Sequence, residues 1–341
     1  MSTRSVVGIE RGTLPFVALG VAVVAVSTSA ILVRYSAAPS LVKAFYRVLF
    51  TTLLLLPFAL VRHRDAFARL TRRDWLAAGA GGVALALHFA SWFASLELTS
   101  VAASVTIVQC QVLFVAAGAA VFLDEFVTRR TVMGMLLALA GIVVLSVGDA
   151  SGGVVAGSAP LLGDALAVAG AAFSAGYVLV GRVLRQRIAL IPYVVVVYSA
   201  CTIVLLALVL ADGAALTNYP PREWLLFLGM AVGPGVFGHT VLNWALGHLE
   251  SSVVSASLLG EPVGSALLAL VLLGEVPTAA TVVGGVVILA GITVVAREEW
   301  PGGPGRARDE RREHREQSES VGEARGCRGA VLCEAVAVAG K

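Results

Sequence analysis

The chain has 341 residues, of which 58% are hydrophobic and only 14% are charged, and its formal net charge is +3 at pH 7. Soluble globular domains carry roughly 25% charged residues. A soluble fold of this length could not hide so much apolar surface, so the composition excludes one and predicts an integral membrane protein.

Apolar runs long enough to cross a membrane recur along the whole chain. A spanning helix needs about 20 mainly apolar residues, and ten such runs are bounded by charges or Gly/Pro clusters. They cover residues 15–33, 41–61, 75–96, 100–123, 131–147, 161–181, 191–211, 224–246, 252–274 and 279–296. The first run continues through Ile31, Leu32 and Val33, which favours a retained span over a cleaved signal peptide. The expected fold is all-α, with ten transmembrane helices.

The two halves of the sequence repeat each other at a constant offset of 150 residues. Residues 131–144 (TVMGMLLALAGIVV) match residues 281–294 (TVVGGVVILAGITV) at eight of fourteen positions, and the same offset aligns Glu125 with Glu275 in the preceding loops. Five spans is an odd number, so the second copy must enter the bilayer from the opposite face. We therefore expect two inverted five-helix repeats, over residues 14–149 and 160–297.

Arginine placement predicts the orientation. Loop 62–74 holds five arginines and loop 182–190 holds three, whereas the alternate loops are almost bare. By the positive-inside rule both termini are then cytoplasmic, in a multi-pass protein of the plasma membrane. Residues 298–341 combine a Gly/Pro break with mixed charge and no apolar periodicity, which predicts a disordered cytoplasmic tail.

Motifs for enzymatic chemistry do not occur in the polar loops. The four cysteines form no CxxC pair and accompany no histidine cluster, so neither a disulfide framework nor a zinc site is indicated. Nucleotide-binding, metalloprotease and serine-hydrolase motifs are also missing from the sequence. We expect no cofactor, no nucleic-acid partner and no enzymatic activity. The energy for any transport must then come from a gradient across the membrane.

A family resemblance rests on short motifs at corresponding places in the two repeats. They are Leu123-Asp124-Glu125 and Leu273-Gly274-Glu275, Gly134/Gly141 and Gly284/Gly291, Phe45-Tyr46-Arg47, and Gly260-Glu261-Pro262. With ten spans in two repeats, residues 14–297 resemble the drug/metabolite transporter superfamily, in its EamA-type branch. The first repeat departs at Asp124, where the pattern has glycine, and at Gln111-Val112. The resemblance implies transport, often export, of amino acids, metabolites or drugs.

Charged side chains at membrane depth face the protein interior or a water-filled cavity. Lys43 and Arg47 lie four residues apart on one face of the second span, which suits the binding of a carboxylate or phosphate. In the alternative interpretation Lys43 extends to the interface and Arg47 binds neighbouring carbonyl groups.

Two histidines occupy nearly equivalent positions in the repeats. His88 and Trp92 in the third span, and His239 and Asn243 in the eighth, are i, i+4 pairs, and Trp244 follows the second pair. The two pairs could line one cavity and relay protons, because histidine titrates near pH 6.5. The alternative is that both histidines are hydrogen-bonded core residues.

The ninth span contains a carboxylate beside a proline. Pro262 interrupts the helix next to Glu261, which makes Glu261 the leading candidate for proton coupling. Gln109 and Gln111 point to different faces of the fourth span, and Gln111 is favoured because it aligns with Glu261. The alternative is a structural Glu261 paired with Arg47 or a histidine. Glu275 is expected to be structural, ahead of the helix cap Thr278.

Together these features predict a secondary active transporter, and in particular an exporter, of small polar metabolites such as amino acids, or of drugs. Its two repeats would alternate access to a site near the midplane. An intramembrane enzyme using Glu261 and the histidines stays open as an alternative, as does a passive channel. The partners expected are a small-molecule substrate, the lipid bilayer and a coupling proton, and a homodimer stays open.

Overall fold

The computed structural model describes residues 14–122, 128–150, 157–185, 187–241, 244 and 260–298. The chain divides into two compact units, residues 1–296 and 297–341, and the helices considered below form the first. Throughout the described residues the regular structure is helical and contains no strand.

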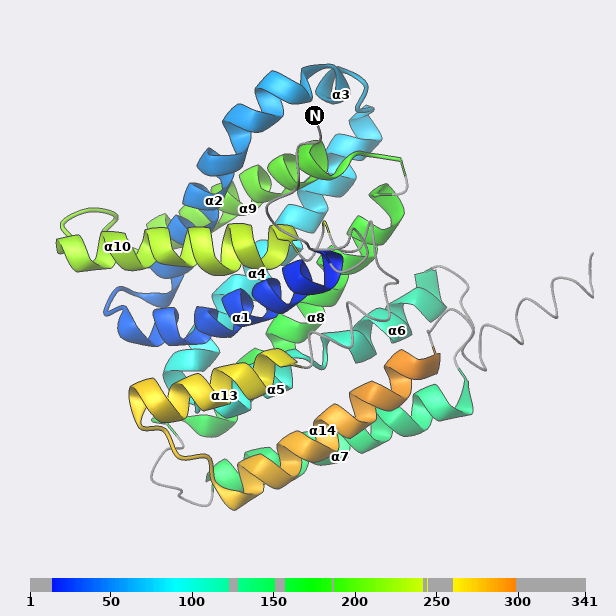
Figure 1. Cartoon of the computed structure of the whole chain (residues 1–341), viewed down its shortest axis with the longest axis vertical. Coiled ribbons are helices and arrows are strands. Elements are labelled where there is room, and N and C mark those ends of the chain that lie inside the picture. Colours follow the sequence, from blue (N-terminus) through cyan, green and yellow to red (C-terminus); the bar gives the residue numbers. More distant parts are fainter. Residues whose placement is uncertain are drawn as a thin grey trace, which may run out of the picture. The chain divides into compact units, whose positions relative to one another are not determined.

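The helices follow one another in two halves, shown in Figure 1. The first half contains α1 (Leu14–Tyr35), α2 (Ser40–Arg62), the short α3 (Arg64–Ala68), α4 (Arg72–Leu98), α5 (Val101–Val108), α6 (Gln111–Phe122) and α7 (Arg129–Ala150). The second half contains α8 (Pro160–Leu184), α9 (Leu190–Asp212), α10 (Pro221–Met230), the π-helix η1 (Ala231–Thr240), α13 (Gly260–Leu273) and α14 (Ala279–Glu298).

Six of these helical segments are long and apolar enough to cross a membrane. They are Val17–Tyr35, Ser40–Arg62, Arg72–Leu98, Val101–Phe122, Pro160–Leu184 and Leu190–Asp212, and shorter apolar helices occupy Val132–Val144, Gly260–Leu273 and Ala279–Val294. An all-helical, multi-pass membrane fold is therefore confirmed, while the number of ten spans stays a prediction.

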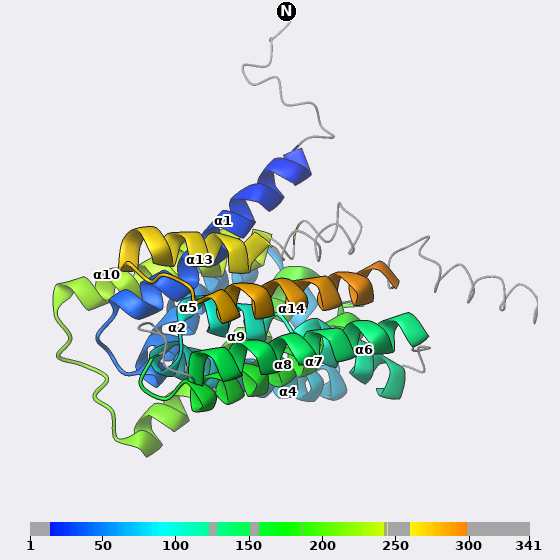
Figure 2. The ribbon, with the colours of Figure 1, turned by 90° about the horizontal axis from the view of Figure 1, so that it is seen from below.

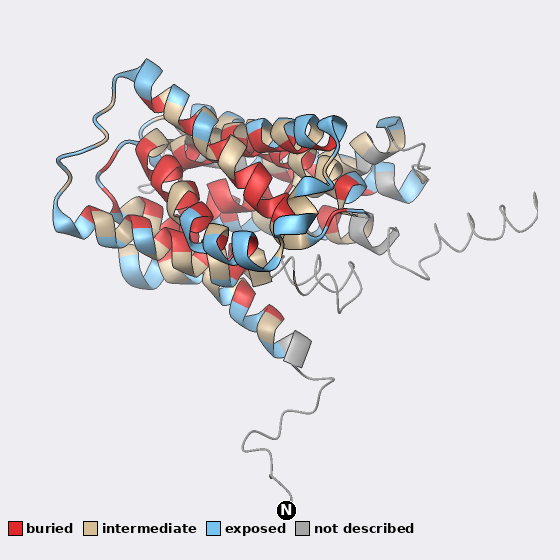
Figure 3. Ribbon diagram, turned by 90° about the horizontal axis from the view of Figure 1, so that it is seen from above, coloured by how far each residue is buried: buried red, intermediate tan, exposed pale blue. Residues whose placement is uncertain are grey.

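Burial follows the pattern of a protein dissolved in lipid. Buried residues face the middle of the helix bundle and exposed residues face outward (Figure 3). Many of the outward residues are large and apolar, such as Leu54, Phe58 and Leu267. A continuous apolar exterior is stable only where lipid replaces water as the solvent.

Helix ends are fixed by local caps. Thr71 and Asp74 form a capping box at the start of α4, in which the Asp74 N–H donates to Thr71 Oγ1 over 3.2 Å and the Thr71 N–H donates to Asp74 Oδ2 over 2.9 Å. Thr278 accepts the Thr281 N–H over 3.0 Å at the start of α14, which confirms the predicted cap.

Two spans are interrupted near their middle. The fourth span breaks at Gln109 and Cys110, between α5 and α6. In the eighth span a π-helix containing Pro234 continues α10, and the proline lacks the N–H of one backbone hydrogen bond. Interrupted helices leave backbone and side-chain polar groups available at membrane depth, where transporters build their sites.

The equivalent helices α7 and α14 pack directly on each other, as Figures 1 and 2 both show. A Cβ atom at Gly291 would lie 2.5 Å from the Gly134 oxygen, and one at Gly141 would lie 2.8 Å from the Gly284 oxygen. The pairing of 134 with 291 and of 141 with 284 means that the two helices run in opposite directions. Opposite directions are what an inverted repeat requires.

Candidate functional site

A buried arginine lies among helices from both halves. Arg47 on α2 is only 2% exposed, and its Nη1 donates to Ser29 Oγ of α1 over 2.8 Å. Its guanidinium carbon lies 4.5 Å from the ring centroid of Phe89 and 5.6 Å from that of Phe93, distances at which the ring faces stabilise a cation. The other terminal nitrogen, Nη2, is buried and has no hydrogen-bond partner among the residues that the structure describes.

Trp92 supplies a second unpaired donor close to Arg47. The Trp92 ring centroid lies 6.0 Å from the Arg47 guanidinium carbon, and within the described part of the chain the buried indole Nε1 has no hydrogen-bond partner. A buried donor without an acceptor costs roughly 1–3 kcal/mol. Arg47 and Trp92 therefore place two such donors on neighbouring side chains.

The His88 ring stacks on the Trp92 ring and so helps to fix the position of Trp92. The two rings stack with centroids 5.8 Å apart, and His88 Nδ1 lies 2.9 Å from the Gly170 carbonyl oxygen on α8. A Cβ at Gly170 would meet the His88 oxygen and Trp92 nitrogen at 3.4 Å, so α4 and α8 approach closely here.

Glu261 forms the acidic part of the cluster. It is 9% exposed at the start of the described part of α13, and its Oε2 accepts a hydrogen bond from Gln109 Nε2 over 2.9 Å. Arg47 and Glu261 are close enough for their charges to interact. No ion pair joins them directly within the described residues.

Gln109 and Gln111 have different partners, and it is Gln109 that contacts Glu261. Gln109 lies in the break between α5 and α6 and contacts Glu261, whereas Gln111 accepts a hydrogen bond from Ser174 of α8. The preference for Gln111 assumed one continuous helix. The break rotates Gln109 toward α13 instead.

Lys43 has binding partners other than a ligand shared with Arg47. Its Nζ donates to the Val33 carbonyl oxygen over 3.1 Å and forms an ion pair with Glu97 over 2.9 Å. Lys43 and Arg47 therefore do not grip one ligand together in this structure, because the Lys43 charge is already neutralised.

The second histidine lies near the same charges. His239, on η1, lies near Arg47 and His88. The described Trp244 is partly buried, and Asn243 lies outside the described residues. The structure thus brings Arg47, His88, Trp92, His239 and Glu261 into one neighbourhood, which we call the central cluster.

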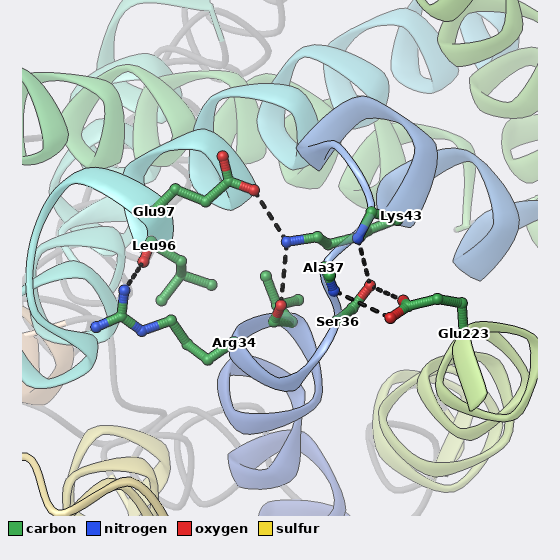
Figure 4. A network of polar contacts seen from close by, with 9 residues as sticks. Arg34, Ser36, Ala37, Lys43, Leu96, Glu97 and Glu223 are labelled. Atoms are coloured by element: carbon green, nitrogen blue, oxygen red, sulfur yellow. Dashed lines mark hydrogen bonds and ion pairs between the residues drawn. The ribbon is translucent and has the colours of Figure 1, made fainter. Parts of the chain in front are cut away.

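A second polar network lies where α1 ends, and Figure 4 shows its contacts of Arg34 with Leu96 and of Glu223 with Ser36 and Ala37. Arg34 forms an ion pair with Glu275 and donates from Nη1 to the Leu96 oxygen over 2.8 Å. Glu275 also accepts the Val101 N–H over 3.0 Å at the start of α5. Because Glu275 belongs to the second half, these contacts tie the two halves together at this end.

Glu223 of α10 makes a parallel connection to the first half. It accepts hydrogen bonds from the Ser36 hydroxyl and, over 3.1 Å, from the Ala37 N–H in the loop after α1 (Figure 4). We call the contacts of Arg34, Glu275 and Glu223 the end network.

Several of these residues carry no signal in the sequence. Ser29 is a small uncharged residue in an apolar span, and the sequence favours Gln111 over Gln109. The Glu275 motif is the sequence signal for the end network. Only contacts between distant segments identify the pairs.

Comparison with known proteins agrees with this architecture. Residues 13–147 and 161–297 each match the model of the EamA-like transporter family. A solved structure described only as "Crystal structure of protein" is 23% identical, covers 83% of this chain and 96% of its own, and superposes with a TM-score of 0.57, which supports the fold. No curated protein sequence matches. The chain belongs to the EamA-like transporter family, within the drug/metabolite transporter superfamily, and is a multi-pass membrane protein of that transporter type.

Proposed function

We propose that the protein is a secondary active transporter, working as an exporter in the plasma membrane, that binds small polar metabolites at the central cluster. The observation that carries this proposal is a pair of buried donors, Arg47 Nη2 and Trp92 Nε1, neither of which has an acceptor among the described residues. A carboxylate is the simplest ligand for a fixed guanidinium with a second donor beside it.

Glu261 and Gln109 give the cluster an opposite pole. A carboxylate and an amide oxygen accept hydrogen bonds from an ammonium group, and Glu261 interacts electrostatically with Arg47. A solute carrying both an acid and an amine would contact both poles at once. This arrangement favours amino acids or related zwitterions as substrates.

The end network supplies one gate for alternating access. Contacts of Arg34, Glu275 and Glu223 join the two halves at the end of α1. At the opposite end Asp74 and Arg187 form an ion pair over 2.6 Å. With both termini cytoplasmic, the end network would close the outer side, and export would require these contacts to separate while the substrate is bound.

Counterflow in proteoliposomes tests the proposal. Vesicles containing the purified protein and an unlabelled amino-acid mixture are diluted into trace labelled amino acids, and transient accumulation is measured. Exchange that is accelerated by internal solute indicates a carrier. Uptake without acceleration would indicate a channel, and chemical conversion of the solute would indicate an enzyme.

Arg47→Gln tests the binding residue. Losing one charge-assisted hydrogen bond of about 1.5–3 kcal/mol should raise the apparent KM roughly 10- to 100-fold. Arg47→Lys should recover only part of this loss, because lysine lacks the planar fork. Arg222→Gln is the matched control, since Arg222 is exposed and donates only to the Tyr35 oxygen over 3.3 Å. Equal KM values for all three variants would contradict the assignment.

A further inference from the structure

A groove separate from the central cluster lies between α4, α6 and α8. Its volume is about 480 Å³. Its walls are apolar and include Ala77, Phe122, Gly176, Leu179 and Val183. Gly176, Leu179 and Val183 recur at helical spacing on α8, so they form one continuous strip. From Gly176 to Leu184 the strip is about 12 Å long.

Two arginines stand at one end of this groove. Arg73, at the start of α4, is exposed and has no hydrogen bond or ion pair within the described part of the chain. Arg187, just after α8, is 55% exposed and shares its charge with Asp74 over 2.6 Å. Two arginines and one aspartate leave this end with a net positive charge.

The arginine end has the residue types that are typical of the lipid-headgroup level. Arg73 follows the arginine-rich loop before α4, and the neighbouring Trp75 is 45% exposed. Tryptophan and arginine concentrate at the boundary between membrane and water. The strip from Leu184 to Gly176 extends from this boundary into the apolar part of the span, and Phe122 and Val183 leave the groove open at its side, with Phe122 77% exposed.

We propose that this groove binds one anionic phospholipid, with its phosphate at Arg73 and Arg187 and one acyl chain along α8. The charge at the mouth selects the anionic headgroup, since basic pockets between membrane helices bind such headgroups. The apolar strip selects a lipid over a soluble phosphate, because a soluble phosphate would leave it empty. The site is independent of the transport substrate and of the direction of transport.

Native mass spectrometry with defined lipids tests the site. The purified full-length protein is exchanged into detergent containing equal amounts of phosphatidylglycerol and phosphatidylcholine, and retained lipid is counted. The wild type should retain one phosphatidylglycerol in preference to phosphatidylcholine. Arg73→Gln should reduce that preference about fivefold. Arg72→Gln is the control, because Arg72 is an exposed neighbour that does not line the groove.

A second pair of variants tests the apolar part. Val183→Trp should displace the lipid while both arginines remain, whereas Val178→Trp should not, since Val178 is exposed on the same helix outside the groove. Monodisperse elution of each variant confirms folding.

Four outcomes would overturn the proposal. The first is equal retention of the two lipids by the wild type. The second is equal loss in Arg72→Gln and Arg73→Gln, which would indicate unspecific charge. The third is displacement of the lipid by glycerol phosphate, which would indicate a soluble anion site. The fourth is a dimer that Val183→Trp dissociates, which would indicate that a second copy occupies the groove.

Discussion

Replacing Gly291 by alanine should loosen the contact between the two repeats. The added Cβ would lie 2.5 Å from the Gly134 oxygen, 2.6 Å from the Ala138 nitrogen and 2.9 Å from the Ala138 Cβ. The two nearest neighbours are backbone atoms of α7, so no side-chain rotation can relieve the overlap. The helices must separate, and their close packing is lost along the whole crossing.

The size of the effect follows from a matched control on the same helix. A Cβ at Gly285 would meet only Thr106, at 3.8 Å, which is ordinary contact. Both substitutions gain about 1 kcal/mol of helix propensity, which cancels in the comparison. Overpacking costs about 1–3 kcal/mol, so Gly291→Ala should be less stable than Gly285→Ala by that amount. The melting temperatures should differ by roughly 2 to 10 °C.

Two buried thiols provide the assay. Cys110 and Cys201 are at most 1% exposed, so a thiol-reactive dye reports unfolding on heating once Cys327 and Cys333 have been changed to serine. Gly141→Ala should behave like Gly291→Ala, because its Cβ would lie 2.7 Å from the Ile288 nitrogen. Equal melting temperatures for Gly291→Ala and Gly285→Ala would refute the reasoning.

Three further predictions concern transport and orientation. Glu275→Gln removes the ion pair with Arg34. In a protein that also carries a cysteine in place of the buried Ala30, this cysteine should then react severalfold faster with an impermeant thiol reagent. An unchanged rate would exclude the end network as a gate. Glu261→Gln should insert normally and lose transport driven by a pH gradient, while exchange at equal pH partly survives; wild-type pH dependence would return Glu261 to a structural role. Cysteines introduced into loops 62–74 and 182–190 should be protected from that reagent in intact cells, and labelling from outside would reverse the orientation.

Composition and local pattern determined the class of the fold. A chain with 58% hydrophobic residues in repeated apolar runs must satisfy its backbone inside lipid, and helices do so within each segment. The duplication was also visible in the sequence, because the glycines of α7 and α14 recur at a fixed offset and now prove to be the contact points between those helices.

The sequence also placed Arg47, His88, Trp92, His239 and Glu261 at membrane depth, because charged and polar residues stand out in apolar spans. It could not show which of them meet. Contact between residues far apart in the chain depends on helix rotation and on breaks in the helices, and neither follows from the spacing along one span.

Only the tertiary structure decided the partners. Because the helix breaks at Gln109 and Cys110, Gln109 rather than Gln111 forms the hydrogen bond with Glu261. Lys43 forms its ion pair with Glu97 rather than lying beside Arg47. Arg34 binds Glu275, although 241 residues of sequence separate the two. A buried charge is stabilised by whichever partner the packed helices bring to it, and that choice is made by packing between segments rather than by any single one of them.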